Sequence, residues 1–185
     1  MGRGNRKNPI EKMPVELLRE PLVWFFAEHY RHRDMCKRLL ELASTMQFDE
    51  GALTDIQHFI ETDMPLHIID EEDDLFPLLR RRCMVDDNIE NVLGILSGEH
   101  ANDMHDASAI KGLIDKAIEE RRGLASFVET EQVLVAFCRS QMRHIAVENA
   151  VVLPIARLRL SERDLVNLGQ RLAARRGLSD PFEAG

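Results

Sequence analysis

The sequence has few aromatic residues, few residues that break helices and no long apolar run. Its 185 residues include one Trp, one Tyr, ten Gly and seven Pro, whereas Leu, Ala, Glu, Arg and Met are common. Strands favour aromatic and β-branched residues and helices favour the residues that are common here, so this composition predicts an all-α chain. No segment approaches 18 consecutive apolar residues, and no apolar run follows the charged start. We therefore expect neither a membrane contact nor a signal peptide.

The chain also has only three cysteines, and its acidic residues outnumber its basic residues. Cys36, Cys83 and Cys138 are widely spaced and form no Cys-x-x-Cys pair, which is typical of the reducing cytoplasm rather than of a disulfide framework. The formal net charge is -8, and no Lys/Arg stripe alternates with aromatic residues. Phosphate backbones require such a stripe, so nucleic acid is not an expected partner.

Apolar residues recur at alternating steps of three and four along four segments, as on helices that bury one face. Turn signals separate the segments at residues 47–51 and 83–88 and at Gly123. This pattern predicts an antiparallel up-down-up-down four-helix bundle with a short extra C-terminal helix after Ser161. The sequence gives no functional signal in that last helix. We expect residues 1–13 to be a mobile tail, residues 14–175 to form one domain and residues 176–185 to be a C-terminal tail.

Each of the four segments carries a stripe of apolar residues along one helix face, and three features of these stripes predict local structure. The first stripe includes Phe25 or Phe26, and the fourth continues through Val151, Ile155 and Leu158. Pro65 lies inside the second stripe, where it removes the hydrogen bond to the carbonyl of Glu61 and either breaks or kinks the helix.

The second and fourth stripes contain the same motif. His67-x-x-x-Glu71 recurs 77 residues later as His144-x-x-x-Glu148, and the surrounding Ile, Pro and Arg residues recur with it. Residues four apart lie on the same helix face, so each motif presents an imidazole beside a carboxylate toward the predicted core. A further histidine precedes each motif, His29 in the first stripe and His100 in the third.

These six residues should lie at one height of the bundle. In an antiparallel pair, two residues are level when the turn lies midway between them, because each helix rises by about 1.5 Å per residue. The midpoint of His29 and the first motif is residue 49, that of the first motif and His100 lies between residues 84 and 85, and that of His100 and the second motif is Gly123. All three midpoints lie in the turns that were identified independently.

Four imidazoles and two carboxylates buried in one layer need strong partners. One interpretation is a hydrogen-bonded network without metal. The other is a pair of first-row transition ions, for which imidazole favours iron, zinc, copper or nickel over calcium or magnesium. The duplicated motif with two level histidines favours the metal site.

The motif pair and the Asp-Glu-Glu context before Leu75-Phe76-Pro77 resemble the hemerythrin-like family with the HHE cation-binding domain. The resemblance covers about residues 21–159. It implies two iron ions with an oxo or hydroxo bridge. By this likeness, His29 and His67 bind one iron, His100 and His144 bind the other, and Glu71 and Glu148 bridge them.

The family resemblance implies a non-haem di-iron protein that binds or senses dioxygen, peroxide or nitric oxide. Oxygen carriers of the family have a second His four residues after the one on the third helix, where this chain has Met104. A thioether is a poor ligand for ferric iron, so this position is left to water, Asp103 or an exogenous ligand, and reversible oxygen carriage is not expected. The alternative is a storage or protein-interaction module that holds iron or zinc without redox chemistry.

Other metalloenzyme classes lack their motifs here. A ferritin-like oxidase needs Glu-x-x-His on two helices, and a zinc protease needs His-Glu-x-x-His; neither occurs. No substrate pocket can be identified from the sequence, so enzyme activity is not the leading expectation, although peroxide or oxygen chemistry at iron stays open.

The expected partners are a diatomic or peroxide ligand and either a partner protein or a second copy of the chain. Of the other histidines, His32 could support the site, and His58 and His105 should face solvent.

Overall fold

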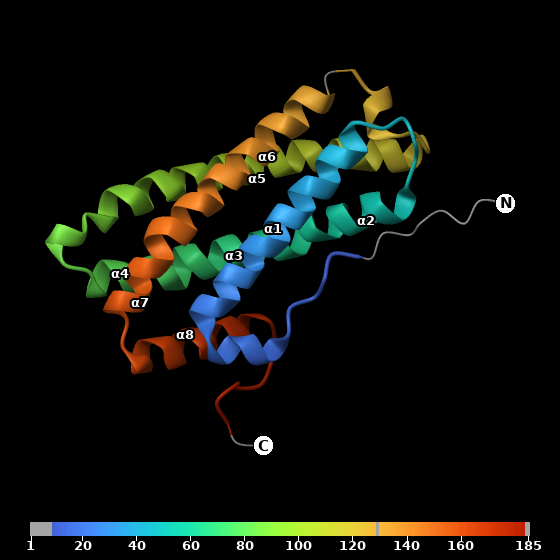
Figure 1. Ribbon diagram of the computed structural model, residues 1–185. Helices are drawn as coiled ribbons and strands as arrows, with labels where there is room; N and C mark the ends of the chain where they lie inside the picture. The colour runs from blue at the N-terminus through green and yellow to red at the C-terminus, as the bar shows by residue number, and fades with distance from the viewer. Residues whose placement is uncertain (1–8, 129, 184–185) are drawn as a thin grey trace. The chain divides into compact units, whose positions relative to one another are not determined.

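The computed structural model describes residues 9–128 and 130–183, and all regular structure in these ranges is helical, with no strand (Figure 1). Within these ranges the chain forms four long helical stretches. The first is α1 (Pro21–Ala43), and the third is α5 (Ile89–Glu119). The second consists of α2 (Glu50–His58), η2 (Phe59–Asp63), α3 (Met64–Ile69), η3 (Asp70–Leu75) and α4 (Phe76–Arg82), and the fourth consists of α6 (Thr130–Val147), η6 (Glu148–Val152) and α7 (Leu153–Arg159). The last helix is α8 (Glu162–Arg175), and short 3-10 turns are η1 (Val15–Arg19), η4 (Val85–Asp87) and η5 (Leu124–Ser126). The all-α prediction is confirmed and the helices are consistent with a bundle, while the up-down-up-down order stays a prediction.

The chain divides into two compact units. One, here called the site unit, comprises Lys12–Tyr30, Leu66–Ala101 and Arg143–Gly185. The other, the companion unit, comprises the described part of Met1–Glu11 together with Arg31–Pro65 and Asn102–Met142. Each long helical stretch therefore contributes residues to both units. All six predicted ligands belong to the site unit.

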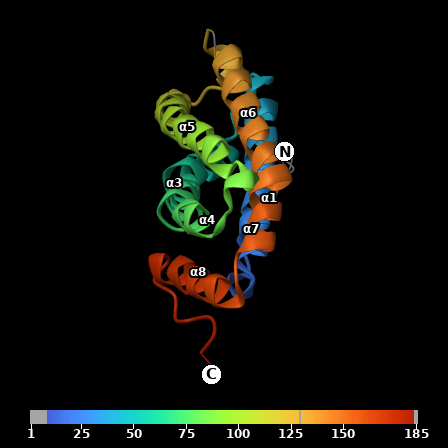
Figure 2. The same ribbon diagram turned by 90° about the vertical axis from the view of Figure 1, so that its left-hand side faces the viewer.

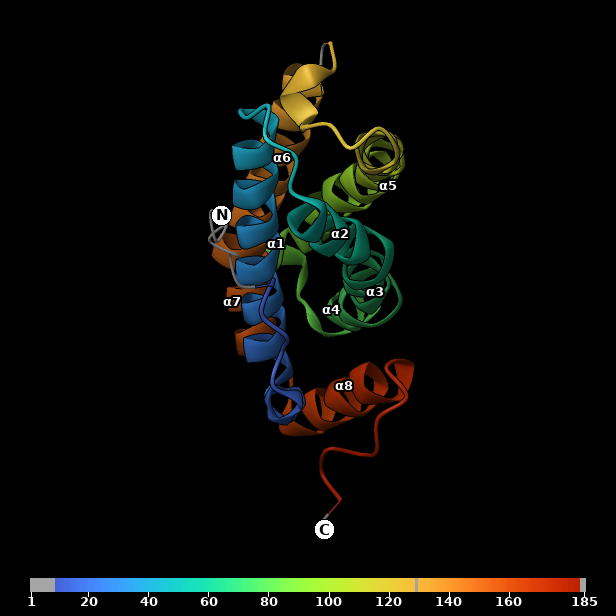
Figure 3. The same cartoon turned by 90° about the vertical axis from the view of Figure 1, so that its right-hand side faces the viewer.

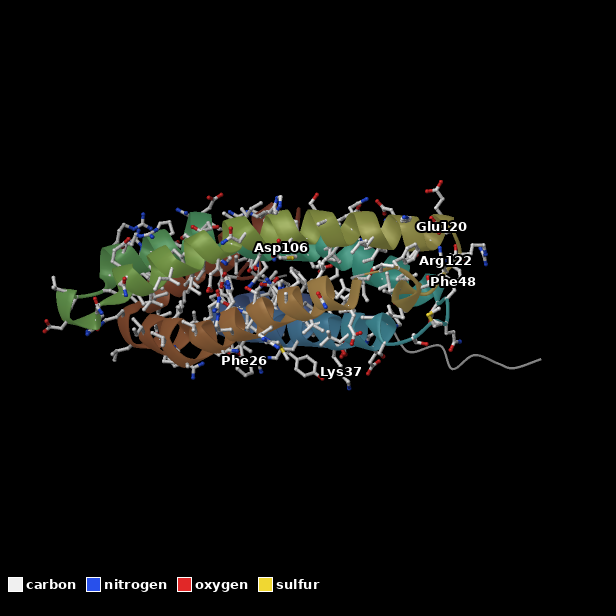
Figure 4. All side chains as sticks on the ribbon, turned by 90° about the horizontal axis from the view of Figure 1, so that it is seen from above. Phe26, Lys37, Phe48, Asp106, Glu120 and Arg122 are labelled. Atoms are coloured by element: carbon white, nitrogen blue, oxygen red, sulfur yellow. The ribbon has the colours of Figure 1, made fainter. Side chains whose placement is uncertain are left out.

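The predicted stripes are the buried faces of the helices. In α1, Phe25 is fully buried whereas its neighbour Phe26 is 57% exposed, and Figure 4 shows Phe26 pointing away from the helices. The apolar core of the site unit is built from η1, α1, η3, α4, α5, η6, α7 and α8, and its members include Phe25, Phe76, Leu93, Val152 and Leu172. Burying these side chains contributes about 1.5 to 3 kcal/mol each, which holds the helices that carry the predicted ligands.

Three internal prolines are accommodated by the same wide turn. A proline cannot donate to the carbonyl four residues earlier, and its ring crowds that carbonyl. Before Pro65, Pro77 and Pro154, the preceding residue donates its N–H to the carbonyl five residues back, so each proline follows a π-helical turn. The acceptors in the last two cases are the carbonyls of Glu71 and Glu148. Helical structure continues past Pro65, so the predicted break is wrong and a π turn takes its place.

The π turn η6 also explains where the fourth stripe departs from the prediction. Leu158 is 71% exposed, and Val151 and Ile155 are only partly buried. The fully buried residues that follow are instead Val152 and Ala156, one position after Val151 and Ile155, and Leu153 and Leu160 are also buried. A π turn contains one more residue than an α turn, so it rotates every following side chain by about 100° around the helix axis.

Helix α8 begins where the sequence predicts. The Ser161 hydroxyl accepts from the N–H of Asp164, and the Asp164 carboxylate accepts from the N–H of Ser161, which forms a capping box. The helix packs against η1 and η3 within the site unit, and Figures 2 and 3 show α8 beside η1. Gly169 makes the close approach possible, because a Cβ there would collide with the carbonyl oxygen of Leu18.

We expect Gly169→Ala to destabilise the protein by about 1 to 3 kcal/mol, since the added methyl has no space. The matched control is Gly98→Ala in α5, where a Cβ meets nothing within 4 Å and a gain of about 0.5 to 1 kcal/mol is expected from helix propensity. Urea unfolding of both variants measures the difference. Equal stability of the two variants would contradict the close packing of α8 on η1.

The first described residues, 9–11, contact the rest of the companion unit. Ile10 is buried, and the side chains of Arg31 and Arg38 donate to the carbonyls of Glu11 and Pro9. The predicted mobile tail falls largely on residues 1–8, which lie outside the described residues. The predicted domain boundaries therefore stay a prediction. No helix in the described part of the chain is long and apolar enough to cross a membrane.

Candidate metal centre

The structure brings all six predicted ligands together in the site unit. They come from four helical stretches and are almost fully buried, with relative exposures from 0% to 4%. The residues are His29 on α1, His67 on α3, Glu71 in η3, His100 on α5, His144 on α6 and Glu148 in η6. Both carboxylates therefore lie in π turns, at the first or second residue of the turn. Each π turn helps to set the direction in which its carboxylate points.

Their donor atoms form two groups that share both carboxylates. The first group is His29, His67, Glu71 and Glu148, and the second is Glu71, His100, His144 and Glu148, with all donor atoms of a group within 4.8 Å of one another. His29 Nε2 lies 3.2 Å from Glu148 Oε2, and His100 Nε2 lies 3.1 Å from Glu71 Oε2. Two donors bound to one ion at about 2.1 Å lie about 3.0 to 3.5 Å apart, so these separations fit a shared ion.

Five of the donor atoms have no hydrogen bond, whereas His144 Nε2 and Glu148 Oε1 lie 2.6 Å apart, at hydrogen-bond distance. No hydrogen bond satisfies His29 Nε2, His100 Nε2, Glu148 Oε2 or either carboxylate oxygen of Glu71, although all are buried. A buried polar atom left unsatisfied costs about 1 to 3 kcal/mol, and a buried carboxylate costs more. Five unsatisfied atoms around two shared carboxylates fit a cation pair better than a completed hydrogen-bonded network. The residues present thus fit a metal pair.

The outer nitrogen of each histidine faces an oxygen. Nδ1 of His29 lies 2.8 Å from Asn149 Oδ1, and Nδ1 of His67 lies 3.1 Å from Glu28 Oε2. On the other side, Nδ1 of His100 lies 2.5 Å from Glu72 Oε1, and Nδ1 of His144 lies 3.5 Å from Glu99 Oε2. For His29, His67 and His100 the oxygen lies at hydrogen-bond distance, so it holds the proton at Nδ1 and leaves Nε2 to face the centre, as in most metal-binding histidines.

These four supporting residues (Glu28, Glu72, Glu99 and Asn149) were not predicted from the sequence. A signal was present, because each of them adjoins a predicted ligand in the chain. Glu28 and Glu99 precede His29 and His100, but they support His67 and His144 on other helices. Spacing along one helix cannot identify such pairs, since the partner lies on a neighbouring helix.

The charged groups in the centre shift one another's pKa values. Burial would lower the pKa of His67, but the carboxylates of Glu71 and Glu28 outweigh it and raise the pKa to about 10. The same balance, with Glu71 and Glu148 as the main carboxylates, raises the pKa of His100 and His144. Burial would raise the pKa of Glu71, but His67, His100 and His29 hold that pKa well below its usual range. Without metal, protons compensate the carboxylates at neutral pH.

We expect the metal-free protein to lose stability as the pH rises from about 7 toward 10. Folding raises the pKa of His67 from 6.5 to about 10. Its protonated form therefore stabilises the fold fully below pH 6.5, and this contribution disappears as the pH passes through about 10. Thermal unfolding of chelator-treated protein across this range measures the loss. His67→Gln should flatten the curve, and an unchanged slope in that variant would contradict the assignment.

Two arginines of α8 and Arg176, the residue that caps its C-terminal end, link this helix to the centre, although no chemistry was predicted for it. Arg176 donates to Glu28 Oε1 at 2.9 Å and to Asp70 Oδ2 at 2.6 Å, and its guanidinium lies over the ring of Trp24. Arg175 binds Asp70 and Asp74, and Arg171 binds Asp74. Glu28 thus connects α8 to His67. Three carboxylates and three guanidinium groups balance in charge, which makes burial of Asp70 tolerable.

The remaining candidates lie in the companion unit. His32 is buried edge-on against Phe59, and His58 and His105 are exposed as predicted. Met104 is 38% exposed, and neither donor group found among the described residues includes Asp103. Whether His32 supports the site stays a prediction.

The cysteines show no sign of nucleophilic chemistry. Cys36 and Cys138 are buried, as expected, and all three cysteines are present as thiols. A hydrogen bond with Cys138 and burial raise the pKa of the Cys36 thiol, which keeps it protonated.

Comparison with known proteins agrees with this geometry. The family model described as hemerythrin HHE cation binding domain matches residues 20–156, which are 137 of the 185 residues. All six predicted ligands and the four supporting residues lie inside the match, and α8 lies beyond its end. A search of curated proteins finds no match. The chain belongs to the hemerythrin HHE cation-binding family.

Proposed function

We propose that the chain holds two iron ions in the two donor groups and uses them to bind or sense dioxygen, peroxide or nitric oxide. One observation carries the proposal: eight donor positions, formed by four histidines and two shared carboxylates, converge in a buried layer, and five of the inner donor atoms have no hydrogen bond. Membership of a cation-binding family supports metal binding independently.

The chain's own residues would hold and orient the ions. Neutral imidazoles and two carboxylates would supply a charge of -2, which suits a pair of divalent or trivalent ions better than a single monovalent one. The His100 ring stacks on Phe76, and the His67 ring packs against Phe25, so apolar walls exclude water from the donors. When bound, the iron pair would supply the redox chemistry toward the small ligand.

The donor count leaves room for such a ligand. Each ion would receive four protein donors, whereas non-haem iron sites that react with oxygen keep further positions open. The chain places an exposed Met104 where oxygen carriers of the family have a histidine ligand. This difference favours sensing or peroxide chemistry over reversible oxygen carriage.

The alternative is a metal-binding storage or interaction module without redox chemistry. Four donors per ion also complete a zinc site, which is usually tetrahedral when its role is structural. The net charge of -8 gives such a module an acidic surface for a protein partner.

Metal analysis combined with an optical spectrum separates these functions. Protein purified from iron-supplemented cells should contain about two irons per chain and show charge-transfer bands, and these bands should change when nitric oxide or peroxide is added. Stoichiometric zinc with no visible band would favour the alternative. Fewer than about one ion per chain after loading with either metal would contradict both.

We further propose that the protein acts in the cytoplasm, where its three thiols stay reduced. A protein partner or a second copy of the chain would receive the signal from the iron centre.

A further inference from the structure

The duplicated motif would make the two ion positions equivalent, but their supporting residues differ. Glu72 and Asn149 occupy corresponding places, since each directly follows a shared carboxylate ligand. Glu72 lies against His100 at 2.5 Å, and Asn149 lies against His29 at 2.8 Å. One histidine of the second group is therefore supported by a carboxylate, and the matching histidine of the first group by a neutral amide.

This difference changes how strongly each imidazole binds a cation. A carboxylate that accepts the Nδ1 proton draws it away from the ring and makes Nε2 a stronger donor, whereas an amide oxygen does so less. The negative charge of Glu72 also attracts the ion itself. Its second oxygen accepts a hydrogen bond from the neutral hydroxyl of Ser97 at 2.9 Å, so among the described residues no Lys or Arg pairs with this carboxylate.

A second asymmetry acts in the same direction. Glu28, which supports His67, shares its carboxylate with Arg176, and both side chains are largely buried at 5% and 13% exposure. Glu99, which supports His144, pairs with Arg143, whose side chain is 66% exposed. Water screens an exposed pair far more than a buried one, so Glu28 is neutralised more completely than Glu99. More negative charge therefore remains around His100 and His144 than around His29 and His67.

We propose that the two ion positions differ in affinity, and that the His100–His144 position binds its divalent ion first and more tightly because of Glu72. This inference rests on the proposed two-ion centre. Changes of supporting residues alter metal affinity by about tenfold to a hundredfold, so the two binding steps should be separated by a factor of that order.

Titration of the metal-free full-length chain with Co²⁺ tests the proposal by calorimetry and visible absorption. The wild type should bind two ions in two resolved steps. Glu72→Gln should weaken the first step by about tenfold to a hundredfold, and Asn149→Asp should strengthen the second step by a similar factor, so that each variant brings the two steps together. Both changes preserve side-chain size and exchange only the charge.

Two controls make the result specific. Asp73→Asn removes a charge from an exposed neighbour and should leave both steps unchanged. His144→Ala should abolish the tight step and His67→Ala the weak one, which assigns each step to its position. Two equal steps in the wild type, or a Glu72→Gln effect matched by Asp73→Asn, would overturn the unequal positions while the two-ion centre stands. Absence of any Co²⁺ binding would overturn both.

Discussion

Glu71→Gln is expected to abolish binding of both ions at once. Glu71 contributes to both donor groups, and its two oxygens lie 3.7 Å from His29 and His67 and 3.1 Å from His100. An amide of the same size has no charge and only one acceptor oxygen, so each ion loses an anionic donor. We expect affinity at both positions to fall by more than about a hundredfold, beyond the range of supporting residues.

The comparison variants are His67→Ala and His144→Ala, each of which removes a donor from one group only. They should retain about one ion, whereas Glu71→Gln should retain none. Metal analysis after gel filtration gives the stoichiometry. The melting temperature should also fall in all three variants. A bound ion stabilises the fold by about 2.7 kcal/mol when its free concentration is 100 times its Kd, and this contribution is lost with the ion. A full metal complement in Glu71→Gln would refute the shared-carboxylate arrangement.

Arg176→Ala should destabilise the protein by about 3 kcal/mol, independently of metal. The substitution removes the partner of Asp70 and Glu28, which are 0% and 4% exposed. Arg175 still binds Asp70, so the expected loss lies at the lower end for a broken buried ion pair. Urea unfolding of the metal-free protein measures this effect without a contribution from ion binding.

Arg171→Ala, on α8, provides the matched control for Arg176, the residue that caps this helix. Arg171 pairs with Asp74, but its side chain is 61% exposed, so its loss should cost at most about 1 kcal/mol. A double-mutant cycle of Arg176→Ala with Asp70→Ala isolates the pairwise energy from other effects of truncation. Similar losses of stability for Arg171→Ala and Arg176→Ala would argue against a stabilising buried ion pair between Arg176 and Asp70.

The sequence predicts which side chains converge because helical periodicity is local. His67 and Glu71 must share a face wherever that helix packs, and the turn midpoints place His29 and His100 level with them. The supporting oxygens could not be predicted in this way. Asn149 reaches His29 across 120 positions of sequence, and only the packing of α1 against η6 brings them together.

The acidic run in η3 shows a second reason why some buried residues could not be predicted from the sequence. Asp70 and Asp74 belong to a stretch of five acidic residues, a pattern that usually indicates a solvated helix face. Both are buried, because Arg175 on α8 reaches back about a hundred residues to bind them. Composition alone cannot reveal that a distant helix supplies the compensating charge. The register shift after Glu148 was missed because helical periodicity does not include π turns.

The position of Trp24 has a practical consequence. It is the only tryptophan in the chain, it is buried, and Arg176 lies 4.8 Å above its ring. Indole emission responds to the polarity of its surroundings and to nearby charge, so the intrinsic fluorescence of the unlabelled protein should report whether α8 is in place. The same spectrum, recorded during iron loading, would show directly whether events at His67 reach the C-terminal helix through Glu28.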